Sequence, residues 1–182
     1  MRVISGKLKG RNIEGFNILG TRPTMDRVKE SIFSMIQNYI NDAVVLDLFS
    51  GSGNYGIEAI SNGAKLAYFN DHNIKCVNVI KENLTNMKVL DQGIITNYDY
   101  KKALNYYKEK NIKFDLVFLD PPYKKHIIND ILNYLIENEL LNNKALVICE
   151  FMEKEEYISE KIALYKEKTY GEKIVFIYKY GN

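Results

Sequence analysis

The fold is decided by the stretch Val44-Val45-Leu46-Asp47-Leu48-Phe49-Ser50-Gly51-Ser52-Gly53-Asn54-Tyr55-Gly56. Its first half, together with the preceding Ala43, is nearly all apolar and includes β-branched side chains, as expected for a strand over residues 43–49 that is covered on both faces in a parallel sheet. The glycines at 51, 53 and 56 permit a sharp turn from strand to helix and a close approach of the backbone to a ligand. The stretch therefore predicts the first strand of a doubly wound α/β sheet, with a binding loop at its end.

Apolar runs and segments of helical period alternate along the rest of the chain, which is typical of a sheet flanked by helices. Helices are predicted over residues 26–40, with Thr24 or Asp26 as N-cap, and over 77–87, 103–107 and 127–136, with a shorter one ending near residue 63. Further strands are predicted at 66–70, 93–96, 114–119 and 145–149, and a hairpin at 164–170 and 173–179 around Gly171. The sequence thus predicts a mostly parallel, seven-stranded sheet with a C-terminal antiparallel hairpin.

The composition is that of one ordinary globular domain. The chain has 182 residues, of which 46% are hydrophobic and 26% charged. Residues 1–30 carry a local net charge of +4, whereas the whole chain carries +2. We therefore expect a basic N-terminal extension over residues 1–24 and a domain over 25–182. The extension indicates either a polyanionic partner or a merely solvated N-terminus.

Several classes of site and location are disfavoured by what the sequence lacks. The spacing of the two cysteines, Cys76 and Cys149, does not indicate a disulfide framework. Neither these cysteines nor the two histidines, His72 and His126, have the spacing of a metal motif. The first residues lack the apolar core of a signal peptide, and no apolar run is long enough to span a membrane. We expect a cytoplasmic monomer without a metal or a membrane partner.

Acidic residues follow three successive predicted strands. Asp47 precedes the glycine-rich loop, where a carboxylate would repel a pyrophosphate but would attract an ammonium or a sulfonium group. Asp71 could accept both hydroxyls of a ribose, and Asp99 would lie beside an adenine, within reach of the Tyr100 backbone N–H. These acids favour a ligand with an ammonium, a ribose and an adenine but no phosphate, and S-adenosylmethionine fits that description. A helix-capping role for Asp71 and a solvated loop position for Asp99 are the simpler alternatives.

The segment Asp120-Pro121-Pro122-Tyr123 ends the fourth predicted strand. The prolines stiffen the chain and remove two N–H donors, which leaves carbonyl groups available as acceptors. An exocyclic amine on a base is a poor nucleophile because its lone pair is delocalised into the ring. The Asp120 carboxylate and the Pro121 carbonyl could hold its hydrogens and turn the lone pair toward a methyl donor, while Tyr123 stacks on a flipped base.

These motifs resemble class I S-adenosylmethionine-dependent methyltransferases, in residues 47–53 with Gly56 and Glu58, and in residues 120–123. More narrowly, the chain resembles the RsmD family, bacterial enzymes that methylate the N2 amine of a guanine in 16S ribosomal RNA. That resemblance is carried by Ile4-Ser5-Gly6, Lys9-Gly10-Arg11, Arg22-Pro23-Thr24-Met25-Asp26-Arg27-Val28-Lys29-Glu30, Asn83 and Tyr170-Gly171.

The resemblance implies a Rossmann-like methyltransferase fold and methylation of 16S ribosomal RNA, free or in the small ribosomal subunit, with S-adenosylmethionine as cofactor. Catalytic roles fall on Asp120, Pro121, Pro122 and Tyr123. Cofactor contacts fall on Thr24, Asp47, Phe49, Gly51, Ser52, Gly53, Asp71, Asp99 and Tyr100, with Asn70 as an alternative ribose ligand. The basic residues expected to contact RNA are Arg2, Lys7, Lys9, Arg11, Arg22 and Arg27.

Other functions remain open at this stage. An amino-methyltransferase acting on DNA or on a protein glutamine would share the glycine-rich loop, although such enzymes often carry Asn in place of Asp120 and a separate recognition domain. A methyltransferase fold that only binds RNA would have lost the site, whereas Gly51, Gly53, Asp120 and Tyr123 are all present. An NAD-dependent oxidoreductase is opposed by Asp47.

Overall fold

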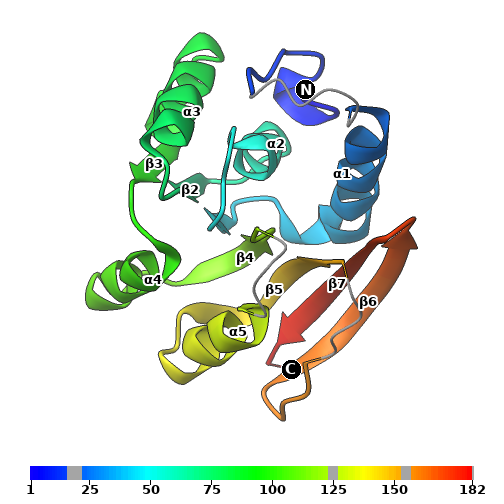
Figure 1. Ribbon diagram of the computed structural model, residues 1–182, viewed down its shortest axis with the longest axis vertical. Helices are drawn as coiled ribbons and strands as arrows, with labels where there is room; N and C mark the ends of the chain where they lie inside the picture. Colours follow the sequence, from blue (N-terminus) through cyan, green and yellow to red (C-terminus); the bar gives the residue numbers. More distant parts are fainter. Residues whose placement is uncertain (16–21, 123–126, 153–156, 182) are drawn as a thin grey trace.

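A computed structural model describes residues 1–15, 22–122, 127–152 and 157–181 (Figure 1). One sheet contains seven strands in the order β3-β2-β1-β4-β5-β7-β6. The strands are β1 (Val44–Asp47), β2 (Leu66–Asn70), β3 (Gly93–Thr96), β4 (Phe114–Leu119), β5 (Leu141–Phe151), β6 (Ile162–Tyr170) and β7 (Lys173–Tyr180). The α-helices are α1 (Arg22–Ile36), α2 (Asn54–Ser61), α3 (Ile74–Asn86), α4 (Tyr100–Glu109) and α5 (Ile128–Glu137). Single 3₁₀ turns are η1 (Gly6–Leu8), η2 (Gln37–Tyr39) and η3 (Leu90–Gln92).

The pairing of the strands confirms the predicted doubly wound sheet. Strands β3, β2, β1, β4 and β5 pair in parallel. Strand β7 inserts antiparallel between β5 and β6. At the tip of the β6–β7 hairpin, Gly171 has a φ of +60°, a conformation that glycine adopts without strain. The order reverses beside β1, so the carboxyl ends of β1 and β4 border the crevice where ligands bind in open α/β sheets.

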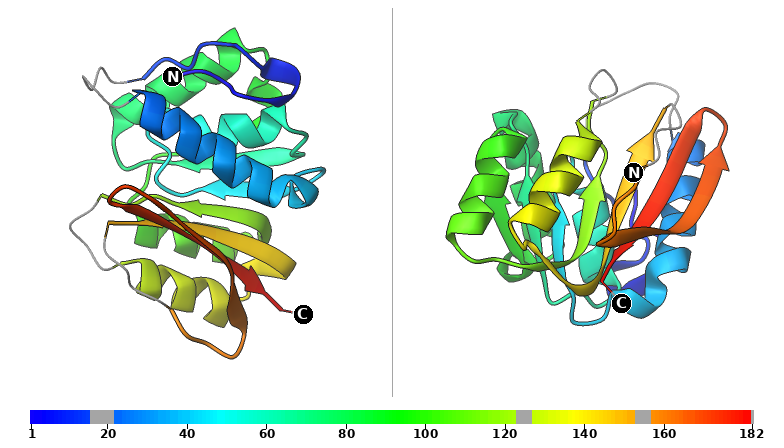
Figure 2. Two further views of the ribbon diagram at one scale, coloured as in Figure 1. Left: turned by 90° about the vertical axis from the view of Figure 1, so that its right-hand side faces the viewer. Right: turned by 90° about the horizontal axis from the view of Figure 1, so that it is seen from below.

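Helices cover both faces of the sheet (Figures 1 and 2). Alternate residues of each central strand enter different cores, because side chains alternate across a strand. Val45 and Phe118, for example, pack with the apolar faces of α1, α2 and α3. Leu46 and Val117 instead pack with α4 and α5. No helix in the described part of the chain is both long enough and apolar enough to cross a bilayer.

The N-terminal residues belong to the core between the sheet and helices α1, α2 and α3. Val3, Leu8 and Ile13 are buried in it, and Arg2 and Asn12 form an isolated antiparallel bridge. Gly6 has a φ of +75°, and a Cβ at this position would overlap the Ser61 carbonyl. The segment therefore packs directly on α2, and a side chain larger than hydrogen at residue 6 would lift it away.

Several element boundaries differ from the prediction by one or more residues, and those of α1, β5 and β1 have a clear physical reason. Helix α1 begins at Arg22, so Thr24 and Asp26 lie inside it and the prediction of either as N-cap is wrong. Proline is tolerated in the first turn of a helix, where its missing N–H has no partner to lose, so Pro23 does not delay the start. Strand β5 begins at Leu141, which pairs with Phe114, and its register with β4 is irregular between Leu141 and Leu146, where Lys144 has a φ of +67°. Strand β1 ends at Asp47 because the chain then bends into the glycine-rich loop.

Candidate active site at the carboxyl ends of β1, β2 and β4

The glycine-rich loop is folded tightly between β1 and α2. Gly51 and Gly53 have φ values of +54° and +82°, which favour glycine. The Gly53 N–H donates to the Ser50 carbonyl at 2.7 Å, and the Ser50 hydroxyl donates to the Asp47 carbonyl at 2.6 Å. A Cβ at Gly56 would overlap the Phe69 ring. The loop backbone therefore lies against the sheet and leaves its outer side open to a ligand.

Asp47 lies under this loop and is only 3% exposed. Its Oδ2 accepts the Gly56 N–H at 3.1 Å, in the first turn of α2. Burial raises the pKa of Asp47 to about 7, and the charges of Asp120, Asp71 and Glu150 add to the rise, whereas the Gly56 N–H opposes it. A buried acid of this kind gains its charge most readily when a cation binds beside it.

Asp71 and Asn70 have different surroundings at the end of β2. The Asp71 Oδ2 accepts the Gly51 N–H at 2.9 Å, which ties the second strand to the loop. The Asn70 side chain is buried and donates to the carbonyls of Leu48 and Tyr98 at 3.2 and 3.0 Å. The Asn70 amide is thus engaged by the residues that follow β1 and β3, whereas the Asp71 carboxylate accepts the N–H groups of Gly51 and Asn73 and has further lone pairs to offer a ligand.

Asp99 and Tyr100 border the same edge of the sheet beyond β3. Asp99 is the N-cap of α4, and its Oδ1 accepts the N–H groups of Lys101 and Lys102 at 3.0 and 3.2 Å. Neither residue 98 nor residue 100 is fully buried, and the Tyr100 ring lies 5.9 Å from the Phe49 ring, centroid to centroid. Phe49 and Tyr100 thus offer an apolar surface beside the loop, where a flat adenine ring could lie.

Asp120 lies opposite the loop, directly after β4. It lines a cavity of about 200 Å³ together with Met1, Val28, Phe49, Ser50, Gly51, Ser52, Asn54, Tyr55 and Lys173. We call this cavity the cleft. Pro121 is buried and Pro122 is exposed, whereas Tyr123 lies outside the described residues. Burial, reinforced by the charge of Glu150, raises the pKa of Asp120 to about 7, and Lys173 opposes the rise.

Sequence reasoning did not identify Lys173, Glu150 and Tyr55 as part of this site. They come from β7, β5 and α2, three elements that no local motif connects. The Tyr55 hydroxyl donates to Glu150, and the Lys173 ammonium forms an ion pair with Glu150. The predicted antiparallel hairpin could have located Lys173, because a strand that pairs antiparallel with β5 begins beside the end of β5.

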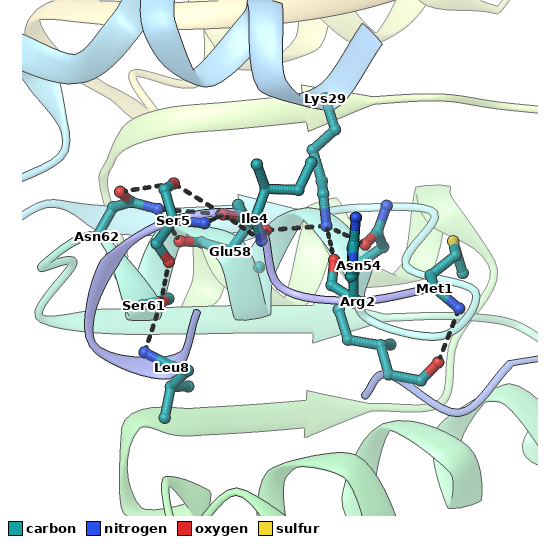
Figure 3. Close-up of polar contacts among 12 residues, drawn as sticks. Met1, Arg2, Ile4, Ser5, Leu8, Lys29, Asn54, Glu58, Ser61 and Asn62 are labelled. Atoms are coloured by element: carbon teal, nitrogen blue, oxygen red, sulfur yellow. Dashed lines mark hydrogen bonds and ion pairs between the residues drawn. The ribbon is translucent and has the colours of Figure 1, made fainter. Parts of the chain in front are cut away.

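A second polar cluster anchors the N-terminal segment beside the cleft (Figure 3). Lys29 on α1 donates to the Arg2 carbonyl at 2.8 Å and to the Asn54 Oδ1 at 2.7 Å. Glu58 on α2 accepts the N–H groups of Ile4 and Ser5 at 3.0 and 2.8 Å. The cluster fixes the positions of Arg2, Ile4 and Ser5, while Met1 lines the cleft and donates to the Ile13 carbonyl at 3.3 Å.

We call the basic residues predicted to contact RNA the basic rim. Arg2, Lys7, Lys9, Arg11 and Arg27 are exposed, and Arg22 lies in the first turn of α1, as does Thr24. The side chain of Arg11 donates to the Asn86 carbonyl at 2.6 Å, and that of Lys7 to Gln92 at 2.6 Å. A separate hollow is lined by Arg2, Val3, Ile4, Lys9, Gly10, Asp26, Arg27 and Glu30.

Among residues 1–15, 22–122, 127–152 and 157–181, no three His, Cys, Asp or Glu side chains gather in a way that could hold a metal ion. The polar side chains that line the cleft are those of Asp120, Lys173, Ser50, Ser52, Asn54 and Tyr55, and the Asp47 carboxylate lies beneath the loop that forms one wall. Such a set suits an organic ligand that carries positive charge.

Comparison with known proteins places these features in a family. The family described as Conserved hypothetical protein 95 matches residues 1–179. Ribosomal RNA small subunit methyltransferase D from Haemophilus influenzae is 36% identical, and the match covers 94% of this chain and 89% of that protein. The solved structure of yhhF from Escherichia coli aligns with a TM-score of 0.87 at 28% identity, covering 100% of this chain and 98% of the other.

A more distant structure supports the fold alone. The RNA methyltransferase from Salinibacter ruber, solved with S-adenosyl-L-homocysteine, aligns with a TM-score of 0.65 at 16% identity, covering 91% of this chain and 95% of that one. Its bound ligand is the product that S-adenosylmethionine leaves after methyl transfer.

Proposed function

The chain belongs to the RsmD family, matched as Conserved hypothetical protein 95, and from this premise we propose that it transfers a methyl group from S-adenosylmethionine to the N2 amine of a guanine in 16S ribosomal RNA. The observation that carries the proposal is the cleft, in which Asp120 faces the glycine-rich loop. The wall formed by the glycine-rich loop suits the cofactor, and the wall that carries Asp120 suits an amine. The small ribosomal subunit or its free RNA is the proposed partner, and the cytoplasm the proposed location.

The residues around the loop fit the cofactor. Asp47, which is buried and accepts the Gly56 N–H at the end of the loop that contains Gly51 and Gly53, would face the cationic methionine end. Asp71 would accept the ribose hydroxyls, and the surface beside Phe49, Ser52, Asp99 and Tyr100 would take the adenine. Thr24, near the start of α1, is proposed to close over the same site. When bound, S-adenosylmethionine supplies a methyl group already activated by the sulfonium charge.

Asp120 and Pro121 would orient the acceptor. The N2 amine of guanine carries two hydrogens, and the Asp120 carboxylate and the Pro121 carbonyl are acceptors for them. Held in this way, the amine presents its lone pair to the methyl group, and the gain comes mainly from proximity and orientation. The nitrogen becomes positive as the N–C bond forms, and the ionised Asp120 carboxylate can take the proton that the nitrogen then sheds. Pro122 would stiffen the segment, and Tyr123 would stack on the flipped base.

The basic rim would hold the RNA backbone. Arg2, Lys7, Lys9, Arg11, Arg22 and Arg27 are proposed to contact phosphates, which orient the RNA without reading its sequence. The anchoring of residues 2–5 on Glu58 and Lys29 supports this role, since it holds the N-terminal segment that carries Arg2, Lys7, Lys9 and Arg11 in a fixed position on the domain.

Nucleoside mass spectrometry of small-subunit RNA tests the proposal. RNA from cells that lack the gene should lose N2-methylguanosine at one position, and the purified protein with S-adenosylmethionine should restore it. Assembled subunits and free RNA, assayed side by side, identify the form of the substrate. An unchanged content of N2-methylguanosine together with no activity in vitro would refute the proposed reaction.

A further inference from the structure

We propose that Lys173 is a positioning residue that holds the Asp120 carboxylate in place and in its charged form, and that Glu150 and Tyr55 hold Lys173. This inference rests on the proposed function, since it concerns the group that would orient the acceptor amine. It assigns a role to three side chains that belong to no motif of the sequence.

The hairpin delivers Lys173 to the cleft. Lys173 is the first residue of β7, and the register pairs Glu150 with Val175 and Phe151 with Ile174. The start of β7 therefore lies beside the end of β5, at the edge of the sheet where β4 leads into Asp120. The Lys173 Nζ lies 4.0 Å from the Asp120 Oδ2 and forms an ion pair with the Glu150 Oε2.

Glu150 is a fixed support for the lysine. Its side chain is 2% exposed, whereas that of Asp120 is 31% exposed. The Tyr55 hydroxyl donates to the Glu150 Oε1, and the Tyr55 ring stacks on Phe118 with centroids 5.0 Å apart and an interplanar angle of 3°. The buried Glu150 carboxylate and the stacked Tyr55 thus hold the Lys173 ammonium, which reaches outward to the more exposed Asp120 carboxylate.

The charges around Asp120 give Lys173 its effect. Asp120 faces Glu150 from β5, Lys173 from β7, Tyr55 from α2 and Asp47 from β1. Burial and Glu150 raise the pKa of Asp120, and Lys173 lowers it. An opposite charge at this distance shifts a carboxyl pKa by about 1–3 units. Without the ammonium, the Asp120 and Glu150 carboxylates would face each other with no cation between them, and Asp120 would hold its proton to higher pH.

Lys173 and Glu150 therefore have opposite effects on the pH dependence of the methylation rate. If the ionised Asp120 is the active form, the rate falls as pH drops through its pKa, which is about 7. Removing the Lys173 charge should move this fall to higher pH, and removing the Glu150 charge should move it to lower pH. A side chain that only supports the fold would reduce the rate equally at every pH.

The test is the single-turnover methylation rate between about pH 5.5 and 9 for the wild type, Lys173→Met, Lys173→Arg and Glu150→Gln. We expect Lys173→Met to move the acidic limb upward by about one pH unit or more, so that its rate deficit shrinks at high pH. Lys173→Arg should restore the wild-type limb, and Glu150→Gln should move it downward. Lys179→Met, at the other end of β7, is the matched control and should leave the limb unchanged.

A second measurement separates this inference from the proposed reaction. The carboxyl ¹³C signal of Asp120 can be titrated in the free protein, without RNA or cofactor. If the wild type methylates RNA but Lys173→Met titrates Asp120 at the wild-type pH, the inference is overturned and the proposed function stands. If the pH at which Asp120 titrates is higher in Lys173→Met but the wild type methylates no RNA, the charge relation stands and the proposed function falls.

Discussion

Lys29 and Glu58 form an ion pair in which the Lys29 Nζ lies 2.8 Å from the Glu58 Oε2, and both side chains are shielded completely from solvent. Burial lowers the pKa of Lys29, although the charge of Glu58 and its hydrogen bond oppose this change. Each partner also binds the N-terminal segment, at the Arg2 carbonyl and at the Ile4 and Ser5 N–H groups. The pair therefore joins α1, α2 and the segment that carries the basic rim.

Lys29→Met should destabilise the protein by about 3–5 kcal/mol, because it leaves the buried Glu58 carboxylate without its cation. Chemical denaturation followed by circular dichroism measures the loss. Lys108→Met on α4, which removes an exposed lysine, is the control and should change stability by less than about 0.5 kcal/mol. A Lys29→Met protein as stable as the control would show that Glu58 finds other partners when the pair is broken.

The affinity for S-adenosylmethionine should depend on pH through Asp47. Its pKa is about 7 in the folded protein, so the carboxyl is largely neutral at pH 6 and charged at pH 8. Only the charged form attracts the cationic methionine end, so we expect affinity to rise by up to about tenfold between these pH values, with release of a proton on binding. Calorimetry in two buffers of different ionisation enthalpy detects that proton.

The Asp47→Asn variant is the control for this titration. Asparagine can still accept the Gly56 N–H, so the loop should keep its shape while the titrating charge is removed. Its affinity should be weaker at pH 8 and nearly independent of pH. The same pH dependence in this variant would assign the titration to another group.

Asp71→Ala should weaken cofactor binding, because the ribose hydroxyls lose a charged acceptor worth roughly 1.5–3 kcal/mol per hydrogen bond. The substitution also removes the acceptor of the Gly51 N–H, so thermal stability must be recorded beside the binding constant. Asp91→Ala, at an exposed aspartate in η3, is the control. Unchanged affinity in Asp71→Ala by calorimetry would exclude Asp71 from the cofactor site.

Asp120→Ala should separate binding from chemistry. Its proposed bonds go to the acceptor amine, so affinity for S-adenosylmethionine should stay within about twofold while the single-turnover rate falls by roughly 10²-fold or more. Asp130→Ala, at an exposed aspartate on α5, should retain the wild-type rate. Full activity of Asp120→Ala would contradict the proposed orientation of the amine.

The parts of the fold that follow local rules could be predicted from the sequence. Strands β1, β2, β4 and β5 are predictable because each contains a short apolar run, and the terminal hairpin is predictable because Gly171 separates two segments rich in aromatic and β-branched residues. Asp47, Gly51 and Asp120 could be placed at one edge because parallel strands end together. The helix start at Arg22 is not predicted, because proline is typical of loops, although a first helical turn also accepts Pro23.

The remaining parts depend on pairings between distant segments. Lys29 and Glu58 lie on different helices, and neither shows in the sequence that it is fully buried. Lys173 reaches Asp120 only because β7 is inserted between β5 and β6. The N-terminal residues illustrate the same limit: their charge pattern is visible in the sequence, whereas the burial of Val3, Leu8 and Ile13 depends on the surface that α1 and α2 present.

The last prediction concerns the basic rim. Lys9 and Arg11 are exposed on the anchored N-terminal segment, so they can meet phosphates without any change in the fold. Binding to phosphates releases counterions, and affinity for RNA should then fall steeply with salt. Lys9→Ala combined with Arg11→Ala should flatten the log–log salt slope by roughly 1.5–2 units, at about 0.7–0.9 for each phosphate that is no longer neutralised.

The measurement is binding to a fragment of small-subunit RNA between low and moderate salt. Lys108→Ala combined with Lys110→Ala removes the same charge from the end of α4, on the opposite face of the sheet, and should leave the slope close to that of the wild type. Affinity for S-adenosylmethionine should not change in either variant, because neither Lys9 nor Arg11 lines the cleft. Because net charge alone would affect both double variants alike, a slope that differs only in the first locates the bound phosphates at Lys9 and Arg11. An identical slope in wild type and both variants would remove the rim from the RNA site.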